Sequence, residues 1–273
     1  MRGINRKKWL QFISLSLPLL LVATISIYFF EKQESKAYLD TISVEVKHHV
    51  ESQREHIHDE IMRNIVHLRF LSNNTALISA LENSDAQSLL AHSKNILAFT
   101  HYLKTYDQVR VLNRQGKEVI RINNRNGVFV HVATEDLQDK SDYYYFKEAM
   151  DMNENEVFIS HFDLNIEHGS IEKPYKPMLR FSTPIMNEAG ERVGVLVLNF
   201  LGSIIFDRYL QGSNIFGSNI MTNSDGHILY SPNPEHHWGS VLPERSHITI
   251  KTLYPKLWPI MSKMQNGQIT IGE

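Results

Sequence analysis

Aromatic and charged side chains gather between Ser141 and Arg180, which makes this stretch the part of the chain best equipped for chemistry. Aromatic rings offer apolar area and cation–π contact to a ligand, and a carboxylate or guanidinium fixes the ligand's orientation. The stretch therefore predicts a binding site for a small polar molecule. The alternative is that its tyrosines fill a sheet and its charges solvate loops. The candidate residues are Tyr143, Tyr144, Tyr145, Asp163, Glu172, Tyr175 and Arg180.

Two carboxylates of this stretch also permit a hydrolase. Asp163 and Glu172 could form an acid/base pair, which requires carboxyl groups about 5–9 Å apart around the substrate bond. Their separation by Gly169 and a loop neither supports nor excludes that distance. A structural or adhesion module, with its interior filled by side chains, is a third alternative.

The sequence gives little indication of a metal site or a catalytic site. The densest group among its 14 histidines lies between His48 and His58. Adjacent histidines on a helix point about 100° apart, whereas metal-ligand pairs need i,i+3 or i,i+4 spacing, so we interpret this group as a solvated helix face. The lack of cysteine removes disulfides and thiolate nucleophiles. No nucleotide-binding or hydrolase motif occurs, and we expect no catalytic residue, metal or cofactor.

The charge of the chain gives no reason to expect a nucleic-acid partner. The formal net charge is -2, and beyond the first eight residues the basic side chains are scattered. Domains that bind nucleic acid instead concentrate basic side chains on one face. We therefore set that class of partner aside.

The N-terminal residues have a membrane-spanning pattern. About 22 residues without a charge, from Trp9 to Phe30, cover the roughly 30 Å of a bilayer's hydrocarbon core as a helix. The residues before them include arginines and lysines but no acidic residue, so the N-terminus should stay in the cytoplasm. A cleaved signal peptide, with a weak site at 35–37, is the alternative. We expect a single retained anchor in a bacterial inner membrane and a periplasmic domain.

Helical periodicity continues beyond the membrane segment. Apolar residues recur at helical spacing from Ser35 to about Leu71, without glycine or proline, which predicts a long amphipathic helix. Cap-forming residues at 72–75 and 83–85 interrupt the helical pattern twice, so we expect three helical pieces in series. The exposed length of the long helix leads us to expect a homodimer formed through it.

After Tyr106 the period changes to that of strands. Two β-rich runs, 109–112 and 118–122, flank a polar turn and predict a hairpin. Strands joined by short turns, with helices gathered at the N-terminal end, predict an α+β module with an antiparallel sheet. Further strand candidates are 128–132, 157–162, 178–183 and 193–200, with a short helix at 145–152.

A second, shorter pattern begins after a predicted linking helix at 204–210. A hairpin over 219–230 lies about 110 residues beyond the first, which predicts two tandem modules. A helix near 257–264 and a strand from Gln268 come next, and Glu273 falls inside that strand. Because a sheet of two or three strands leaves apolar surface uncovered, we expect the natural protein to continue beyond this residue.

One group of motifs, together with the order of these parts, carries a family resemblance. These residues resemble the double Cache (dCache, tandem PAS-like) sensor domain of bacterial membrane signal transducers, over roughly residues 35–273. The motifs are a Val-Leu-x-x-x-Gly-x-Glu-Val-Ile-Arg hairpin, Lys140-Ser141-Asp142-Tyr143-Tyr144-Tyr145-Phe146-Lys147-Glu148-Ala149, Val157-Phe158-Ile159-Ser160, Pro174-Tyr175-Lys176-Pro177-Met178-Leu179-Arg180-Phe181 and Thr183-Pro184-Ile185.

The resemblance implies a membrane-distal module that binds a small molecule and a membrane-proximal module that usually does not. A second membrane helix would lead to an output such as a histidine kinase of a two-component system, a diguanylate cyclase or a chemotaxis receptor. Amino-acid-binding relatives carry an Arg-x-Trp-Tyr element where this chain has Tyr143 to Phe146, so the arginine that grips an α-carboxylate is missing. Tyr145 takes the tryptophan's place, and Asp163 could hold an amine. The substitutes for an anionic partner are Arg121 and Arg180.

We therefore expect an extracytoplasmic sensor that reports a small polar ligand (an amine, an amino-acid-like compound or an organic acid) through the long helix to the membrane. We expect no enzyme activity in this chain itself. Only a ligand with different affinity for two arrangements of that helix can signal. The expected parts are a cytoplasmic tail 1–8, a transmembrane helix 9–30, a helical stalk 31–105, a membrane-distal PAS-like ligand-binding module 106–203 and an incomplete membrane-proximal PAS-like module 204–273.

Overall fold

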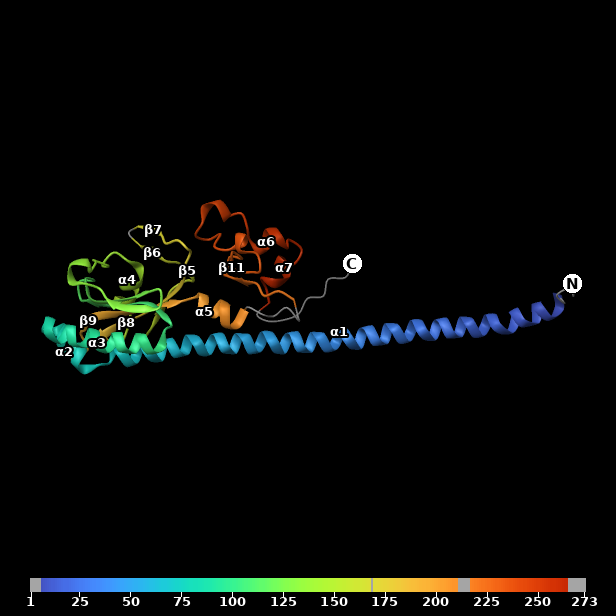
Figure 1. Ribbon diagram of the computed structural model, residues 1–273, viewed down its shortest axis with the longest axis horizontal. Coiled ribbons are helices and arrows are strands. Elements are labelled where there is room, and N and C mark those ends of the chain that lie inside the picture. The colour runs from blue at the N-terminus through green and yellow to red at the C-terminus, as the bar shows by residue number, and fades with distance from the viewer. Residues whose placement is uncertain (1–5, 168, 211–216, 265–273) are drawn as a thin grey trace. The chain divides into compact units, whose positions relative to one another are not determined.

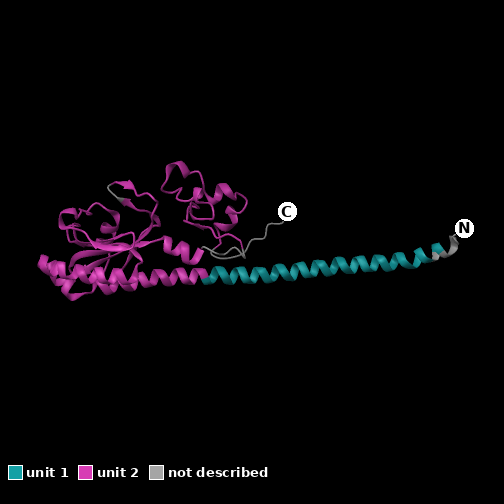
Figure 2. Cartoon of the chain, in the orientation of Figure 1, with its two compact units in different colours: residues 1–52, 266–273 teal, residues 53–265 magenta. Residues whose placement is uncertain are grey.

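The computed structural model describes residues 6–167, 169–210 and 217–264 (Figure 1). The chain falls into two compact units, with residues up to Ser52 in one and residues 53–265 in the other (Figure 2). The second unit contains the sheet and all the candidate site residues.

Helix α1 runs from Arg6 to Ser72 without interruption. It is long and apolar enough to cross a membrane, with a stretch whose mean hydropathy is 2.1. The next helix begins at a cap, because Asn74 Oδ1 accepts a hydrogen bond from the backbone N–H of Leu77 at 3.0 Å. Asp85 caps the third helix in the same way. The three predicted helical pieces are confirmed as α1, α2 (Thr75–Glu82) and α3 (Ala86–Leu103).

The main sheet is antiparallel, with the strand order β3-β2-β1-β9-β8-β4 and with β5 paired to β8. The sheet has two long hairpins, and a polar turn connects the two strands of each, at 114–117 in the first and at 187–191 in the second. The predicted α+β class with an antiparallel sheet is thus confirmed. The strands are β1 (Tyr106–Asn113), β2 (Glu118–Arg125), β3 (Val128–His131), β4 (Phe158–Ile159), β5 (Asp163–Leu164), β8 (Pro177–Met186) and β9 (Arg192–Leu201).

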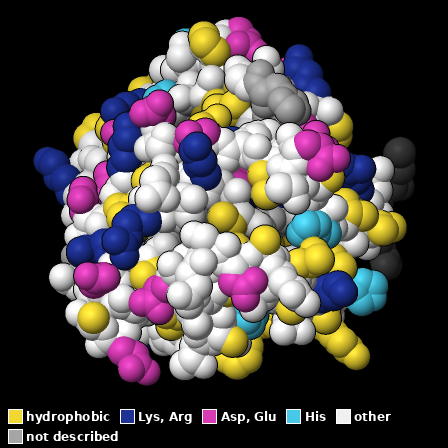
Figure 3. Space-filling model, turned by 90° about the vertical axis from the view of Figure 1, so that its left-hand side faces the viewer, with side chains coloured by type: hydrophobic (Ala, Val, Ile, Leu, Met, Phe, Trp, Pro, Cys, Tyr) yellow, Lys and Arg dark blue, Asp and Glu magenta, His cyan; other side chains and the backbone are white. Residues whose placement is uncertain are grey.

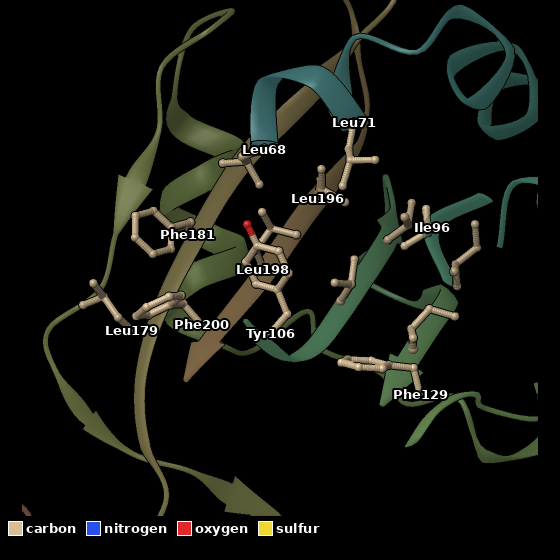
Figure 4. Close-up of a cluster of buried hydrophobic side chains, with 14 of the residues drawn as sticks. Leu68, Leu71, Ile96, Tyr106, Phe129, Leu179, Phe181, Leu196, Leu198 and Phe200 are labelled. Atoms are coloured by element: carbon tan, nitrogen blue, oxygen red, sulfur yellow. The ribbon is translucent and has the colours of Figure 1, made fainter. Parts of the chain in front are cut away.

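One face of the sheet is apolar and packs against the helices (Figure 4). Alternation along the strands sends Val109, Leu196 and Leu198 to this face, where all three are fully buried. Leu68 from α1 and Ile96 from α3 pack in the same cluster. Burying a side chain of this size contributes about 1.5–3 kcal/mol. The C-terminal end of α1 is therefore held to the sheet by the protein's main core.

The opposite face of the sheet carries α4 (Tyr144–Asp151), which confirms the short helix predicted from the sequence. Tyr145, Phe146 and Ala149 are its buried residues. They form a second, smaller cluster with Val195 and Val197 of β9. The two faces of the sheet are thus covered differently, by three helices on one side and by one short helix on the other.

The strand expected at 157–162 is shorter than predicted. It is present as β4, and the separate strand β5 comes after it. The backbone N–H of Arg180 donates to the Ser160 hydroxyl at 2.9 Å, so a side chain takes the place of a strand carbonyl and the ladder breaks there. The next element is a small hairpin of β6 (Ile166–Glu167) and β7 (Ser170–Ile171), which the sequence did not indicate.

Short elements make up the chain after β9. The linking helix is confirmed as α5 (Ser203–Ile205) with one π-helical turn, η2 (Phe206–Leu210). The second hairpin turns where expected, with Asn223 Oδ1 accepting backbone hydrogen bonds from Asp225 at 3.1 Å and His227 at 2.9 Å, but its strands are shorter than expected. The expected strand from Gln268 lies outside the described residues. The other elements are β10 (Met221–Thr222), β11 (Ile228–Tyr230), α6 (Ile250–Leu253), α7 (Trp258–Met261, shorter than predicted) and the turns η1 (Thr134–Asp136), η3 (Pro234–His236) and η4 (Pro243–Arg245).

Candidate ligand-binding site

A row of polar side chains crosses the face of the sheet opposite the three helices. Adjacent strands contribute one residue each, in register: Asn123 of β2, Gln108 of β1, Asn199 of β9 and Arg180 of β8. All but Asn123 are buried, and Asn199 is 0% exposed. Asn199 Nδ2 donates to Gln108 Oε1 at 3.1 Å, whereas Asn199 Oδ1 has no hydrogen-bond partner among the described residues. Buried unpaired polar atoms are unfavourable for folding alone, so this row points to a role other than packing.

Beside this row, one carboxylate serves two guanidinium groups. Glu118 Oε1 lies 3.0 Å from Arg110 Nε, and Glu118 Oε2 lies 3.7 Å from Arg121 Nη1. All three side chains are buried. Arg110 also donates to Gln108 Oε1 and, at 3.3 Å, to the hydroxyl of Tyr145. Arg110 therefore connects the polar row of the sheet to α4.

A second ion pair lies at α4. Arg180 Nη1 is 2.6 Å from Asp163 Oδ1, and the Tyr144 hydroxyl donates to Asp163 Oδ2 at 3.3 Å. The Arg180 guanidinium lies 6.0 Å from the centre of the Tyr145 ring. Burial raises the pKa of the Asp163 carboxyl, and the charge of Arg180 opposes that rise. Burial also raises the pKa of Tyr144 and of Tyr145, so both hydroxyls stay protonated at neutral pH and can donate.

A hollow of about 410 Å³ opens beside β1 and β2. Its lining includes Lys176, whose Nζ lies 2.7 Å from Glu172 Oε1 and 3.3 Å from Asp107 Oδ1. Burial alone would lower the pKa of Lys176, but the hydrogen bond with Glu172 and the charge of Asp107 raise it above its ordinary value. We call this site the polar hollow. Its lining residues are Asp107, Gln108, Arg121, Asn123, Asn124, Arg125, Asn126, Glu172 and Lys176.

Most of the predicted site residues fall into two groups on this side of the sheet. The first group surrounds the ion pair at α4, and the second lines the polar hollow. Gln108 and Arg110, which the sequence did not single out, join the two groups through their contact with each other. The first group is Tyr144, Tyr145, Asp163 and Arg180, and the second is Arg121 and Glu172.

The two remaining predicted residues lie at the margin of these groups. The Tyr143 ring is 5.5 Å from the Tyr145 ring, and Lys140 Nζ lies 4.2 Å from the centre of the Tyr143 ring. Tyr175 instead contacts Lys173, whose Nζ is 5.7 Å from the ring centre. Neither tyrosine lines the polar hollow.

The acid/base pair of the hydrolase interpretation gains no support from these contacts. Asp163 is held by Arg180, whereas Glu172 is held by Lys176 and by Asn165 Nδ2 at 2.8 Å. Each carboxylate is thus engaged by its own cation. A general acid or base needs a carboxyl group free to exchange a proton with a substrate.

The sequence missed the residues that lie at the centre of this face. Gln108, Arg110 and Glu118 look like the solvated positions of an ordinary hairpin, yet all three are buried. Asn199 did carry a signal, because it is the polar residue inside the apolar run 193–200 of a central strand. A single amide side chain in such a run indicates that this face of the strand contacts other polar groups.

In the described part of the chain, no group of three or more histidine or acidic side chains could hold a metal ion. Figure 3 shows basic and acidic side chains interspersed on one face of the molecule. A nucleic-acid surface would instead concentrate basic side chains.

A match to a known family agrees with this arrangement. The family model of the bacterial histidine kinase sensor domain matches residues 40–272. The chain belongs to this family. It is a sensor domain of a bacterial signal transduction protein, which confirms the predicted sensing function and the resemblance seen in the sequence. Such a domain receives a signal and is not itself an enzyme.

Solved structures share the fold of this sensor domain. A domain of a sensory box/GGDEF family protein from Vibrio parahaemolyticus has a TM-score of 0.74 at 24% identity, covering 86% of this chain and 88% of that chain. The extracellular domain of a protein described as a histidine kinase, vpHK1S-Z8, also has a TM-score of 0.74 at 24% identity, with 86% and 84% covered. The sensor domain of the V. cholerae histidine kinase DctB has a TM-score of 0.52 at 14% identity, with 73% and 70% covered. No curated protein sequence matches the chain.

Proposed function

We propose that this sensor domain binds a small polar molecule in the polar hollow and reports its presence through the sheet to α1. The observation that carries the proposal is the polar row across four strands, of which Gln108, Asn199 and Arg180 are buried. Burying amide and charged groups costs free energy unless they are well paired. A sheet face needed for stability alone would be filled with apolar side chains, as the opposite face is.

The same sheet offers a physical route from the ligand to the helix. Gln108 of β1 lines the polar hollow, while the next residue, Val109, packs in the core with Leu68 of α1. A ligand that shifts β1 therefore changes the surface on which α1 packs. Signalling requires only that the ligand prefer one of the two resulting arrangements.

The proposal places the sensor outside a bacterial inner membrane, in the periplasm. The apolar part of α1 would be the anchor, with residues 1–8 in the cytoplasm. We further propose that 106–203 is the membrane-distal module that binds ligand and that 204–273 belongs to a membrane-proximal module. The output would be a histidine kinase, a diguanylate cyclase or a chemotaxis receptor.

We also propose that the sensor works as a homodimer formed along α1. Met62, Val66 and Phe70 recur at i, i+4 and i+8 on this helix, and Phe70 is 70% exposed. An apolar stripe of this kind suits a parallel partner helix. Cysteine cross-linking at Val66 tests the dimer, with the exposed Arg54, about 120° around the helix from Val66, as a position expected to react less. Failure of Val66→Cys to cross-link in membranes would count against it.

A thermal-shift screen tests the proposed function. Amines, amino acids, organic acids and neutral polyols are added to the purified chain in detergent micelles, and the melting temperature is recorded. At least one class should stabilise the chain, because a ligand that binds only the folded state raises stability by mass action. The variant Asn123→Val, at a residue of the polar row that also lines the hollow, should fold but lose that stabilisation. Equal stabilisation of both proteins would rule out the polar row as the site.

A further inference from the structure

The charges around the polar hollow narrow the chemistry of its ligand, an inference that rests on the proposed function. Its cations are Arg121, Arg125 and Lys176, and its acids are Asp107 and Glu172. The lining thus has one more cation than acid. A ligand with one negative charge would balance it.

The two acids of the hollow are already engaged. Both lie against Lys176 Nζ, Glu172 at 2.7 Å and Asp107 at 3.3 Å. Glu172 also accepts a hydrogen bond from Asn165 Nδ2 at 2.8 Å. A ligand ammonium group would have to displace Lys176 to reach either carboxylate. The hollow therefore disfavours an amine as the principal group of the ligand.

Arg125 supplies the positive charge available at this site. Its guanidinium has no ion-pair or hydrogen-bond partner among the described residues, and its side chain is exposed at the end of β2. Nearby, Glu118 is held more closely by Arg110 (3.0 Å) than by Arg121 (3.7 Å). A guanidinium binds a carboxylate through two parallel N–H donors, which makes an anionic group the natural partner here.

The amide side chains of the hollow present donors to a ligand. Asn123 Oδ1 accepts from Arg121 Nε at 2.9 Å, and Asn124 Oδ1 accepts from the backbone N–H of Gly127 at 2.7 Å. The amide nitrogens of these two asparagines have no partner among the described residues. With the oxygens occupied, the nitrogens remain to donate, and they match hydroxyl or carboxylate oxygens.

The lining of the hollow also excludes a ligand with a large apolar part. The lining residues include no aromatic or aliphatic side chain, and Tyr143, Tyr144 and Tyr145 lie instead at α4. An apolar group placed here would gain little from burial. The volume of about 410 Å³ suits a molecule at the small end of the usual range, roughly 300–1,000 Å³.

We propose that the ligand of the polar hollow is a small polyhydroxylated carboxylate. Its carboxylate would pair with Arg125 and Arg121, and its hydroxyl groups would accept hydrogen bonds from Asn123 and Asn124. Lys176 stays paired with its two acids, Glu172 and Asp107.

Calorimetric titration of the full chain in detergent micelles tests this class with four matched six-carbon compounds. Gluconate carries the acid and the hydroxyls, sorbitol has hydroxyls without charge, glucamine replaces the acid with an amine, and hexanoate has the acid without hydroxyls. Gluconate should bind at least tenfold more tightly than the other three. Binding of sorbitol, glucamine or hexanoate as tight as that of gluconate, or no binding of gluconate, would overturn the proposal.

Arginine variants at the two ends of one hairpin distinguish loss of a ligand contact from a general effect of removing a positive charge. Arg125→Gln should weaken gluconate binding about tenfold, whereas Arg125→Lys should lose less. Arg114→Gln, the same substitution at the other end of this hairpin, should leave binding unchanged. If gluconate fails while another class stabilises the chain in the thermal-shift screen, the ligand class is wrong and the sensing function stands. If no class stabilises the chain, the proposed function fails as well.

Discussion

The Tyr106 hydroxyl and His67 Nδ1 lie 2.7 Å apart, which joins the first strand of the sheet to α1. Tyr106 is fully buried, and two residues later Gln108 lines the polar hollow on the other side of the sheet. Strand β1 therefore contacts both the candidate ligand site and the helix that leads toward the membrane. Burial raises the pKa of Tyr106 and lowers that of His67, so this hydrogen bond joins two neutral groups at neutral pH.

The lowered pKa of His67 predicts a loss of stability in acid. Below the ordinary histidine pKa of about 6.5, the unfolded chain takes up a proton that the folded chain resists. The contribution of His67 is thus complete above that pH and declines as the pH falls through the window between the two pKa values. Thermal unfolding at pH 7.5 and pH 5.5 should show a smaller acid shift in His67→Gln than in the wild type.

Two comparisons check that assignment. Burial lowers the pKa of His237 as well, so part of the acid shift should remain in the His67 variant. His58→Gln, on an exposed position of the same helix, should behave as the wild type does. An unchanged acid shift in His67→Gln would show that this histidine titrates normally in the folded chain.

The apolar core predicts that alanine substitution will cost much more unfolding free energy at one leucine than at another. Leu198 is 0% exposed in the main cluster, so Leu198→Ala should cost about 2–5 kcal/mol of unfolding free energy. Leu90 is 51% exposed on α3, and Leu90→Ala should change stability by no more than about 0.5 kcal/mol. Chemical denaturation measures both. Similar losses in the two variants would contradict the packing described for β9.

The ion pair between Asp163 and Arg180 predicts that a second substitution will recover stability lost by the first. Asp163→Asn leaves the buried Arg180 guanidinium without its carboxylate and should destabilise the chain by about 2 kcal/mol. Adding Arg180→Met removes the unpaired charge, so the double variant should recover part of that loss. Asp151→Asn, the same substitution at the exposed C-terminal end of α4, is the matched control. A double variant less stable than Asp163→Asn would mean that the pair is not the source of the effect.

A buried carboxylate on α1 predicts how firmly the linking helix is held. Glu60 Oε2 accepts from the Tyr209 hydroxyl at 3.0 Å and from Arg63 at 2.5 Å, and Arg208 lies 3.5 Å away. Glu60→Gln should speed hydrogen exchange in 203–210 by weakening these charge-assisted bonds. Glu55→Gln, on the exposed side of α1, should leave exchange there unchanged. Equal exchange in both variants would show that η2 is held by its apolar packing alone.

The sequence predicted the fold well where local periodicity decides structure. The helical breaks at Ser72 and Asn83 arise from cap residues, and both long hairpins arise from their polar turns. The predicted strand 157–162 was too long, because the Ser160 hydroxyl takes the place of a backbone acceptor. No local sequence pattern indicates such a hydrogen bond. The second hairpin was predicted with longer strands than β10 and β11 have.

The candidate site was predicted only at its edges. Residue type alone marked Tyr144, Tyr145, Asp163 and Arg180, because so many rings and charges gathered in one stretch are conspicuous. The alternation around Arg110 looks the same whether water or α4 covers that face, so its burial could not be foreseen. Cross-strand register, which aligns the polar row, depends on pairing between β1 and β9, about 90 residues apart in the sequence.

Hydrogen exchange with and without the strongest stabilising compound of the thermal-shift screen tests the central claim most directly. The claim is that a ligand on the polar side of β1 alters how α1 packs on the other side. Bound ligand should slow exchange in 106–125 and also change exchange in 60–72 of α1, and both changes should vanish in Asn123→Val, which alters the lining of the hollow. Protection confined to 106–125, with α1 unchanged at saturating ligand, would contradict the account.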